Sequence, residues 1–283
     1  MAKKFAQLPF YYRLLIEAAA IYLFVVIAIF IFQRHLEYFP YSAPMDAPKD
    51  AGVPEMSPVH VTTTDGLDLV AWFAPPKKKN GDIVVLFHGN AGNIEMRSNK
   101  ARLLLDHGYG VFLSEYRGFG GNPGDPSEQG LYEDGRAALK WLENKGYKKS
   151  QLVIYGESVG TGIAVQMALE LQPKYLILEA PFTSAADVAK DAYHHLLPVD
   201  LLMHDRYDSI DKIAKIKTSL LIIHGTADSV VPTKFGIQLF KAASQPKRLL
   251  LVHDANHWNL YNYGAGERIA DWLDKQVAGE KGT

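Results

Sequence analysis

The sequence predicts an α/β fold, in which a mostly parallel central sheet carries helices on both faces and one transmembrane helix precedes the folded domain. Apolar, strand-like runs alternate with helix-like segments over most of the chain, a pattern typical of parallel sheets. The dipeptide Asp65-Gly66, between two strand-like runs, predicts an antiparallel hairpin at the start of the sheet. Residues 14–32 (LLIEAAAIYLFVVIAIFIF) are apolar at nearly every position.

The composition excludes several classes of protein. Of the 283 residues, 48% are hydrophobic and 22% are charged, which are the proportions of a folded globular protein. The formal net charge of −1 leaves no basic excess, so we expect no nucleic-acid partner. The chain contains no cysteine, which excludes disulfides, thiolate metal sites, iron–sulfur clusters and a cysteine nucleophile.

Residues 1–39 are expected to form an N-terminal membrane anchor. As a helix, residues 14–32 span about 28 Å at about 1.5 Å per residue, close to a hydrocarbon core of about 30 Å. Aromatic residues at 10–12 and 38–41 suit the two membrane–water interfaces. A cleaved signal peptide fits less well, because the small residues Ser42-Ala43 are followed by Pro44. A buried core helix is the remaining alternative.

The charges beside this segment predict its orientation. Lys3, Lys4 and Arg13 precede it, and Arg34 follows it. The positive-inside rule therefore favours a cytoplasmic N-terminus and places the folded domain outside the cytoplasm, in the periplasm or a lumen. Residues 40–58 contain five prolines and predict an extended linker to the domain of residues 59–283.

Local patterns predict each element of that domain. Val59–Thr64 and Leu67–Ala74 form the hairpin, and the apolar run Ile83–Phe87 predicts a strand buried on both faces. A helical pattern covers Glu128–Asn144. The other expected strands are Val111–Leu113, Leu152–Tyr155, Tyr175–Leu178, Ser219–Ile223 and Arg248–Val252, and the other expected helices are Gly160–Leu171, Thr233–Ala243 and Gly266–Gln276.

A nucleophile motif lies between a predicted strand and a predicted helix. Residues 156–160 read Gly-Glu-Ser-Val-Gly, a G-x-S-x-G pattern. The flanking glycines are needed because a sharp strand-to-helix turn leaves no room for Cβ atoms, and this turn lifts the Ser158 hydroxyl clear of the backbone. The positive end of the following helix points at the same place. The alternative is a serine that only caps the helix.

A serine hydroxyl needs a base, and the sequence offers a base and a carboxylate to orient it. His257 and Asp228 each follow the end of a predicted strand. The carboxyl ends of parallel strands share one edge of a sheet, so we expect both to lie near Ser158. His253 is the alternative base and Asp254 is the alternative carboxylate.

An oxyanion hole is expected beside the nucleophile. The strand that ends at Phe87 is followed by His-Gly-Asn-Ala-Gly, whose glycines allow the backbone to approach a substrate closely. We expect the backbone amides of Asn90 and Val159 to be the donors, with Ala91 as the alternative to Asn90. An ordinary glycine-rich turn is the competing interpretation.

These motifs make the sequence resemble the α/β-hydrolase superfamily, and most of all the small membrane-anchored hydrolases of the α/β-hydrolase-domain (ABHD) group and their bacterial relatives. The resemblance implies an eight-stranded sheet, a triad of Ser158, Asp228 and His257 in the family's chain order, oxyanion donors at Asn90 and Val159, and no cofactor. The segments that carry it are HGNAGN (88–93), EYRGFGGNPGDPSEQGLYEDGRAALKWL (115–142), YGESVGTGIA (155–164), EAPFTSAADVA (179–189), HGTADSVVP (224–232) and ANHWNLY (255–261).

The chain departs from that family in two places. Where relatives have Asp-Tyr-Arg-Gly, residues 115–118 read Glu-Tyr-Arg-Gly, which keeps the charge. Relatives that deacylate lipidated proteins have a cysteine-rich N-terminus, whereas this chain has a transmembrane segment and no cysteine. The resemblance therefore does not predict depalmitoylation.

The expected substrate pocket depends on a short lid at residues 181–217. Leu197 and Leu201 of this segment are expected to line an acyl site, and Trp258 beside the base is expected to form a wall. Ordinary packing between lid and core is the alternative use of such residues.

The sequence thus predicts a membrane-anchored serine hydrolase that cleaves carboxylic esters or thioesters through an acyl-enzyme. The substrate is expected to be a small-molecule or lipid acyl ester. The histidines show no metal-ligand spacing, so no metal is expected. Two alternatives remain: an amidase or peptidase with the same triad, and a catalytically silent membrane-anchored scaffold.

Overall fold

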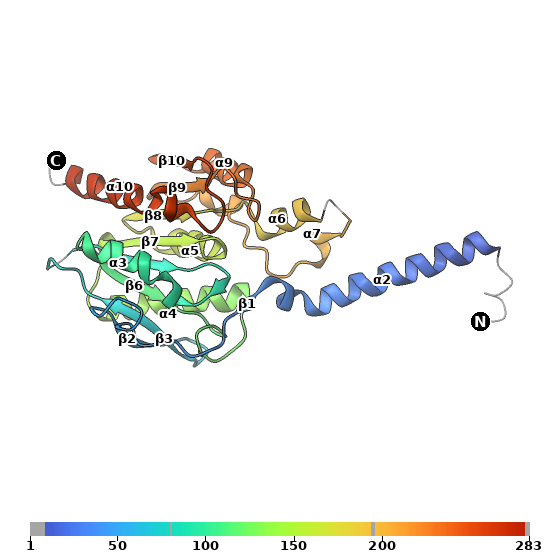
Figure 1. Ribbon diagram of the computed structural model, residues 1–283, viewed down its shortest axis with the longest axis horizontal. Coiled ribbons are helices and arrows are strands. Elements are labelled where there is room, and N and C mark those ends of the chain that lie inside the picture. The colour runs from blue at the N-terminus through green and yellow to red at the C-terminus, as the bar shows by residue number, and fades with distance from the viewer. Residues whose placement is uncertain (1–8, 80, 194–195, 281–283) are drawn as a thin grey trace.

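An eight-stranded sheet forms the centre of the protein (Figure 1). The computed structural model describes residues 9–79, 81–193 and 196–280. The strand order is β10-β9-β8-β7-β4-β6-β3-β2, and only the pairs β2–β3 and β3–β6 of this described sheet are antiparallel. The strands are β2 (Ser57–Thr62), β3 (Asp68–Ala74), β4 (Ile83–Phe87), β6 (Gly110–Ser114), β7 (Leu152–Glu157), β8 (Tyr175–Glu179), β9 (Ser219–Gly225) and β10 (Lys247–Val252).

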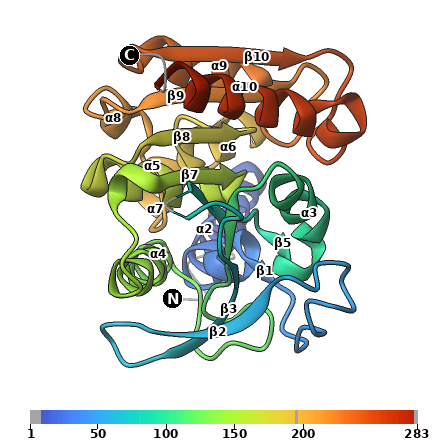
Figure 2. The same ribbon diagram turned by 90° about the vertical axis from the view of Figure 1, so that its left-hand side faces the viewer.

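Helices cover both faces of the sheet, with α3 and α10 on one side and α4 and α5 on the other (Figure 2). In β4, Val84 and Leu86 pack in the core beneath α3 and α10, while Val85 packs in the core beneath α4 and α5. Every residue of β4 is therefore buried, as the uninterrupted apolar run predicted. The bounds of the long helices of the domain are α3 (Ser98–Asp106), α4 (Glu128–Asn144), α5 (Val159–Leu171), α9 (Thr233–Ala242) and α10 (Ala265–Glu280).

The predicted fold class is confirmed. Strand β4 and helix α4 have the predicted bounds, whereas β7 and β9 each run two residues further than predicted. Helix α3 was not expected; it buries Ala101, Leu104 and Leu105, which lie on one face at helical spacing. Short 3₁₀ helices are η1 (Ile94–Arg97), η2 (Lys149–Gln151) and η3 (Leu260–Tyr263).

The N-terminal apolar segment forms one long helix, α2 (Phe10–Glu37), which projects away from the domain (Figure 1). This helix of 28 residues is long and apolar enough to cross a membrane. Of its residues, only Gln33 is buried. The helix continues past the predicted span of 14–32 as far as Glu37. Lys3 and Lys4, on which the predicted orientation partly depends, lie outside the described residues.

Residues 40–58 differ from the predicted extended linker, because the segment packs against the domain. Val53 and Met56 are buried in the core beneath α3 and α10. At its start, β1 (Phe39–Pro40) pairs in parallel with β5 (Ala91–Gly92) in a second, two-stranded sheet. The prolines set an irregular backbone path, but the apolar side chains between them are buried like any others.

The connection between β8 and β9 contains the predicted lid. It holds three short helices, α6 (Ala185–Ala192), α7 (Val199–Leu202) and α8 (Ile210–Ile213). Helices α6 and α7 lie beside the end of α2 that is nearest the sheet (Figure 1).

Candidate active site

Ser158 occupies the sharp turn from β7 into α5. Its φ of 52° and ψ of −120° are unusual for a residue with a side chain, and its amide donates to the Glu179 carbonyl at 2.9 Å. A Cβ at Gly156 would lie 2.5 Å from the Gly160 carbonyl oxygen, and one at Gly160 would lie 2.1 Å from the Phe87 carbonyl oxygen. Only glycine therefore fits on either side of this turn. The Ser158 side chain makes no helix-capping hydrogen bond, unlike the capping alternative.

The structure brings the three predicted triad residues together. The Ser158 Oγ lies 2.9 Å from the His257 Nε2, and the His257 Nδ1 lies 2.8 Å from the Asp228 Oδ2. With the ring proton on Nδ1, His257 donates to the carboxylate and accepts from the serine hydroxyl. The other carboxylate oxygen of Asp228 accepts the amides of Val230 at 2.9 Å and Val231 at 2.8 Å.

The surroundings of Asp228 keep it ionised. Burial alone would raise the pKa of Asp228, but the hydrogen bonds from His224 and His257 outweigh that effect and hold the pKa well below its usual range. The His224 Nε2 lies 3.3 Å from Asp228 Oδ2 and 2.8 Å from the Val231 carbonyl oxygen. The sequence analysis missed His224, although it sits at the end of β9, four residues before Asp228.

The alternative base and carboxylate lie elsewhere. The side chains of His253 and Asp254 are 87% and 72% exposed, and they pair with each other at 2.9 Å. They therefore do not compete with His257 and Asp228.

The predicted oxyanion loop lies against the nucleophile. A Cβ on Gly89 would be 3.2 Å from the Ser158 Cβ, so the loop after β4 passes beside the hydroxyl. Among the described residues, neither the Asn90 nor the Val159 amide donates to a turn, cap or side-chain hydrogen bond. The Asn90 side chain instead accepts the Phe39 amide at 3.1 Å and donates to the Glu37 carbonyl, which ties the loop to the end of α2.

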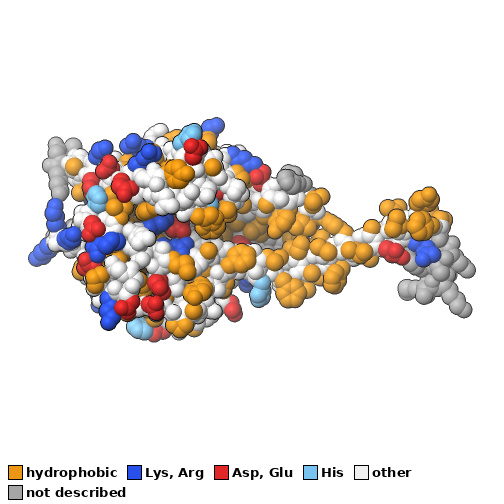
Figure 3. Space-filling model, viewed as in Figure 1, with side chains coloured by type: hydrophobic (Ala, Val, Ile, Leu, Met, Phe, Trp, Pro, Cys, Tyr) orange, Lys and Arg blue, Asp and Glu red, His pale blue; other side chains and the backbone are white. Residues whose placement is uncertain are grey.

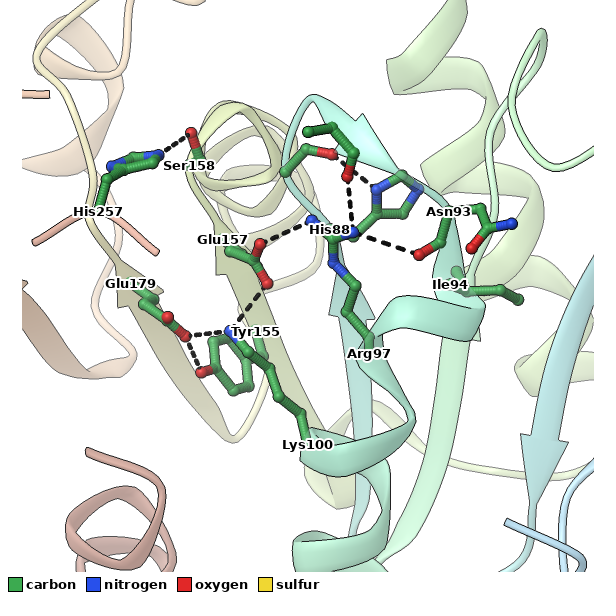
Figure 4. A network of polar contacts seen from close by, with 12 residues as sticks. His88, Asn93, Ile94, Arg97, Lys100, Tyr155, Glu157, Ser158, Glu179 and His257 are labelled. Atoms are coloured by element: carbon green, nitrogen blue, oxygen red, sulfur yellow. Dashed lines mark hydrogen bonds and ion pairs between the residues drawn. The ribbon is translucent and has the colours of Figure 1, made fainter. Parts of the chain in front are cut away.

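A buried ionic network holds this loop and the nucleophile turn together (Figure 4). Arg97 donates to the Ala91 carbonyl at 2.6 Å and to Glu157 at 2.8 Å. Lys100 bridges Glu157 at 2.8 Å and Glu179 at 2.6 Å. Burial alone would raise the pKa of Glu157, but the charges of Lys100 and Arg97 outweigh it and hold that pKa far below its usual range.

A second buried pair supports the same loop. The His88 Nε2 lies 2.7 Å from Glu115 Oε1, and the other Glu115 oxygen accepts the Ile94 amide at 2.9 Å. Both side chains of this pair are fully buried. Glutamate, where relatives have aspartate, therefore reaches both ends of the loop.

A pocket of about 620 Å³ opens at Ser158 and His257. Leu197 and Trp258 line it as predicted, and the Trp258 ring stands edge-on to His257 with centroids 4.8 Å apart. The prediction for Leu201 is wrong, because its side chain is 83% exposed and lies outside the pocket. Successive residues of α7 point about 100° apart, so Leu202 lines the pocket and Leu201 faces outwards.

No cluster suited to a metal ion is found in the part of the chain that the structure describes, counting groups of three or more His, Asp or Glu side chains. Near Ser158, His257 is instead paired with Asp228, and Glu157 is paired with Arg97 and Lys100.

Comparisons with known proteins agree with the α/β fold. The sequence model of the serine aminopeptidase family, S33, matches residues 78–209, a range that includes Ser158 but ends before Asp228. The Mycobacterium tuberculosis protein Rv2307c is 38% identical over 235 residues, which cover 82% of this chain and 83% of that protein. Human alpha/beta hydrolase domain-containing protein 17B is 33% identical over 206 residues, which cover 70% and 68% of the two chains. The solved structure of the Pyrococcus furiosus esterase Pf2001 has the same fold, with a TM-score of 0.68 at 20% identity over 84% of this chain and 98% of that one.

Proposed function

Since the chain belongs to the α/β-hydrolase superfamily and resembles its ABHD-type members, we propose that it is a membrane-anchored serine hydrolase of carboxylic esters or thioesters. The observation that carries the proposal is the hydrogen-bonded series Ser158–His257–Asp228, with distances of 2.9 Å and 2.8 Å. A nucleophile, a base and a group that orients the base are the recurring parts of acyl transfer by serine.

The proposed reaction has two stages. His257 takes the Ser158 proton while the serine oxygen attacks the substrate carbonyl, and the oxyanion accepts hydrogen bonds from the Asn90 and Val159 amides. The protonated His257 then gives its proton to the departing alcohol or thiol, which leaves Ser158 acylated. In the second stage His257 activates a water that attacks the acyl-enzyme, and the acid product leaves as the Ser158 hydroxyl is restored.

The test is labelling with a fluorophosphonate probe, followed by hydrolysis of p-nitrophenyl acetate. We expect the full chain to react and Ser158→Ala to lose both labelling and at least about 10⁴-fold in kcat. Ser57→Ala, at an exposed serine of β2, is the matched control and should keep wild-type labelling. A folded wild-type protein that neither reacts nor hydrolyses the ester would overturn the proposal and favour a silent scaffold.

An amidase or peptidase with the same triad is the second candidate. The matched family is described as serine aminopeptidases. In addition, the Glu37 carboxyl group lines the pocket, and among the described residues neither of its oxygens has a hydrogen-bond partner. A carboxyl group in this position can accept hydrogen bonds from a free amino terminus. Faster hydrolysis of alanine p-nitroanilide than of p-nitrophenyl acetate, reversed by Glu37→Gln, would favour this candidate.

Membrane anchoring by α2 is part of the proposal, and its length and apolar composition support it. We expect the full chain to stay with membranes after washing with alkaline carbonate, and release into the supernatant would contradict the anchor. We further propose that the domain lies outside the cytoplasm. A cysteine placed at Ser57 is then expected to react with a membrane-impermeant maleimide in intact cells.

A further inference from the structure

The helix expected only as an anchor also forms a wall of the substrate pocket. Ile29, Gln33, Leu36 and Glu37, all from α2, line the same pocket as Ser158. The pocket therefore lies between the proposed catalytic residues and the end of the proposed membrane segment.

The lid is attached to α2 along its length. Gln33 donates from its side-chain amide to the Leu202 carbonyl at 2.9 Å and accepts the His204 amide at 2.8 Å. The Arg34 guanidinium pairs with the lid residue Asp205 at 2.9 Å. Further along the helix, the Tyr22 hydroxyl donates to the Leu196 carbonyl at 3.1 Å.

These contacts set the depth of the lid relative to the bilayer. Tyr22 precedes Arg34 by twelve residues, which is about 18 Å along a helix at about 1.5 Å per residue. If Arg34 lies at the head groups, Leu196 lies well inside a hydrocarbon core of about 30 Å, even when α2 is tilted.

The surface of the lid suits that position. Leu196 is 73% exposed, Leu201 is 83% exposed and Tyr193 is 50% exposed. Hydrophobic side chains run along α2 and continue onto the adjoining lid (Figure 3). The charged side chain of Asp200 is paired with Lys190 and with Arg206. Lipid tails would cover the exposed apolar side chains, which in water would form a large unprotected patch.

We propose that the lid inserts into the bilayer together with α2, and that the substrate is a membrane-resident acyl lipid whose chain enters the pocket from the bilayer between these two elements. This inference rests on the proposed hydrolase function. The pocket volume of about 620 Å³ lies in the range that accepts a small-molecule ligand, and α2 and the lid form one side of the pocket. The chain would lie against apolar side chains of α2 and α6, with its ester carbonyl at Ser158.

The first test narrows the pocket at Ala192, an exposed residue at the end of α6 that lines it. The full chain in phosphatidylcholine vesicles is assayed with p-nitrophenyl palmitate in the vesicles and with p-nitrophenyl acetate in solution. We expect Ala192→Trp to lower the palmitate-to-acetate ratio of kcat/KM at least tenfold. Ala278→Trp, at an exposed position of α10, should leave the ratio unchanged. An unchanged ratio in Ala192→Trp would overturn the proposed path of the chain.

The second test measures depth and does not depend on activity. Because the chain has no cysteine, a polarity-sensitive fluorophore can be attached at a single introduced thiol. In vesicles that contain nitroxide-labelled phosphatidylcholine, Leu201→Cys should be quenched at least twofold more than Leu251→Cys, which is 40% exposed on β10. Equal quenching would overturn lid insertion.

The outcomes separate the two proposals. If acetate hydrolysis and fluorophosphonate labelling fail, the hydrolase function is wrong, whatever the depth of the lid. If they succeed but the palmitate ratio and the quenching do not respond, the hydrolase function stands and the membrane-resident substrate is wrong.

Discussion

The two sides of the pocket are built differently. On one side, the loop after β4 and the turn at Ser158 are joined by buried ion pairs among Arg97, Lys100, Glu157 and Glu179. On the other side, α2 and the lid meet through a few hydrogen bonds, one ion pair in which the Arg34 side chain is half exposed, and apolar side chains that are largely exposed.

This difference matches the two tasks that the proposed function gives to the pocket. Acyl transfer needs donors and a base held within a fraction of an ångström of their working positions, and charged groups buried together supply that rigidity. A substrate must enter and leave, so the side that admits it is expected to have a lower free energy of local opening.

The largest effect on the rigid side is expected from Asp228. Asp228→Asn keeps the size of the side chain but favours the wrong tautomer of His257, and we expect kcat for p-nitrophenyl acetate to fall about 10⁴-fold, the size of loss seen for the same change in another serine hydrolase. Asp254→Asn is the matched control at an exposed acid and should stay within about twofold of wild type. Equal activity in the two variants would show that Asp228 does not orient the base.

The next largest effect concerns stability. Lys100→Met removes the lysine that pairs with Glu179, whose side chain is only 5% exposed, and leaves this carboxylate with the hydrogen bond from the Tyr155 hydroxyl. We expect the free energy of unfolding to fall by about 3–5 kcal/mol. Lys140→Met removes an exposed pair with Glu143 and should cost at most about 1 kcal/mol. Urea unfolding of both detergent-solubilised chains measures the difference. Equal losses in the free energy of unfolding would mean that the buried network stabilises the fold no more than surface ion pairs do.

The rigid side was largely predictable from the sequence, because its residues follow strand ends in short motifs. Ser158, Asp228 and His257 were found in this way, and the parallel sheet brings their positions to one edge. His224 could have been found by the same reasoning, since it ends β9. The partners Arg97 and Lys100 could not, because they lie on η1 and α3 and reach Glu157 only through the folded loop.

The lid side was predicted less well for a physical reason. The orientation of Leu201 depends on how the single turn of α7 sits against α2, and residues that are distant in sequence decide this. Gln33 directly follows the predicted span of residues 14–32, and its side chain is buried against the lid. The prolines of residues 40–58 resembled a free linker, although Val53 and Met56 are buried in the core.

A third prediction concerns the stability of the protein at low pH. The folded-state pKa of Glu157 is depressed, so the unfolded state binds a proton first as the pH falls. The contribution of Glu157 to the free energy of unfolding is complete at pH values above its pKa in the unfolded state, about 4.5. Below that pH the contribution decreases by up to about 1.4 kcal/mol per pH unit. In urea unfolding at pH 7, 4.5 and 3.5, wild type should lose more stability below pH 4.5 than Glu157→Gln does. Parallel losses would assign the acid sensitivity to other carboxylates.

The smallest effect is expected at the junction of lid and helix. Gln33→Ala removes two hydrogen bonds to the lid and leaves the Leu202 carbonyl and the His204 amide without these partners, so the lid should open more easily by about 1–2 kcal/mol. Cleavage by trypsin at Lys190 and Arg206 should then be about 5–30 times faster in the solubilised chain. Gln166→Ala, which removes a hydrogen bond to Glu170 on the surface of α5, should leave the rate unchanged. An unchanged rate in Gln33→Ala would mean that the Arg34–Asp205 ion pair, the Tyr22–Leu196 hydrogen bond and apolar contacts hold the lid on α2 without help from Gln33.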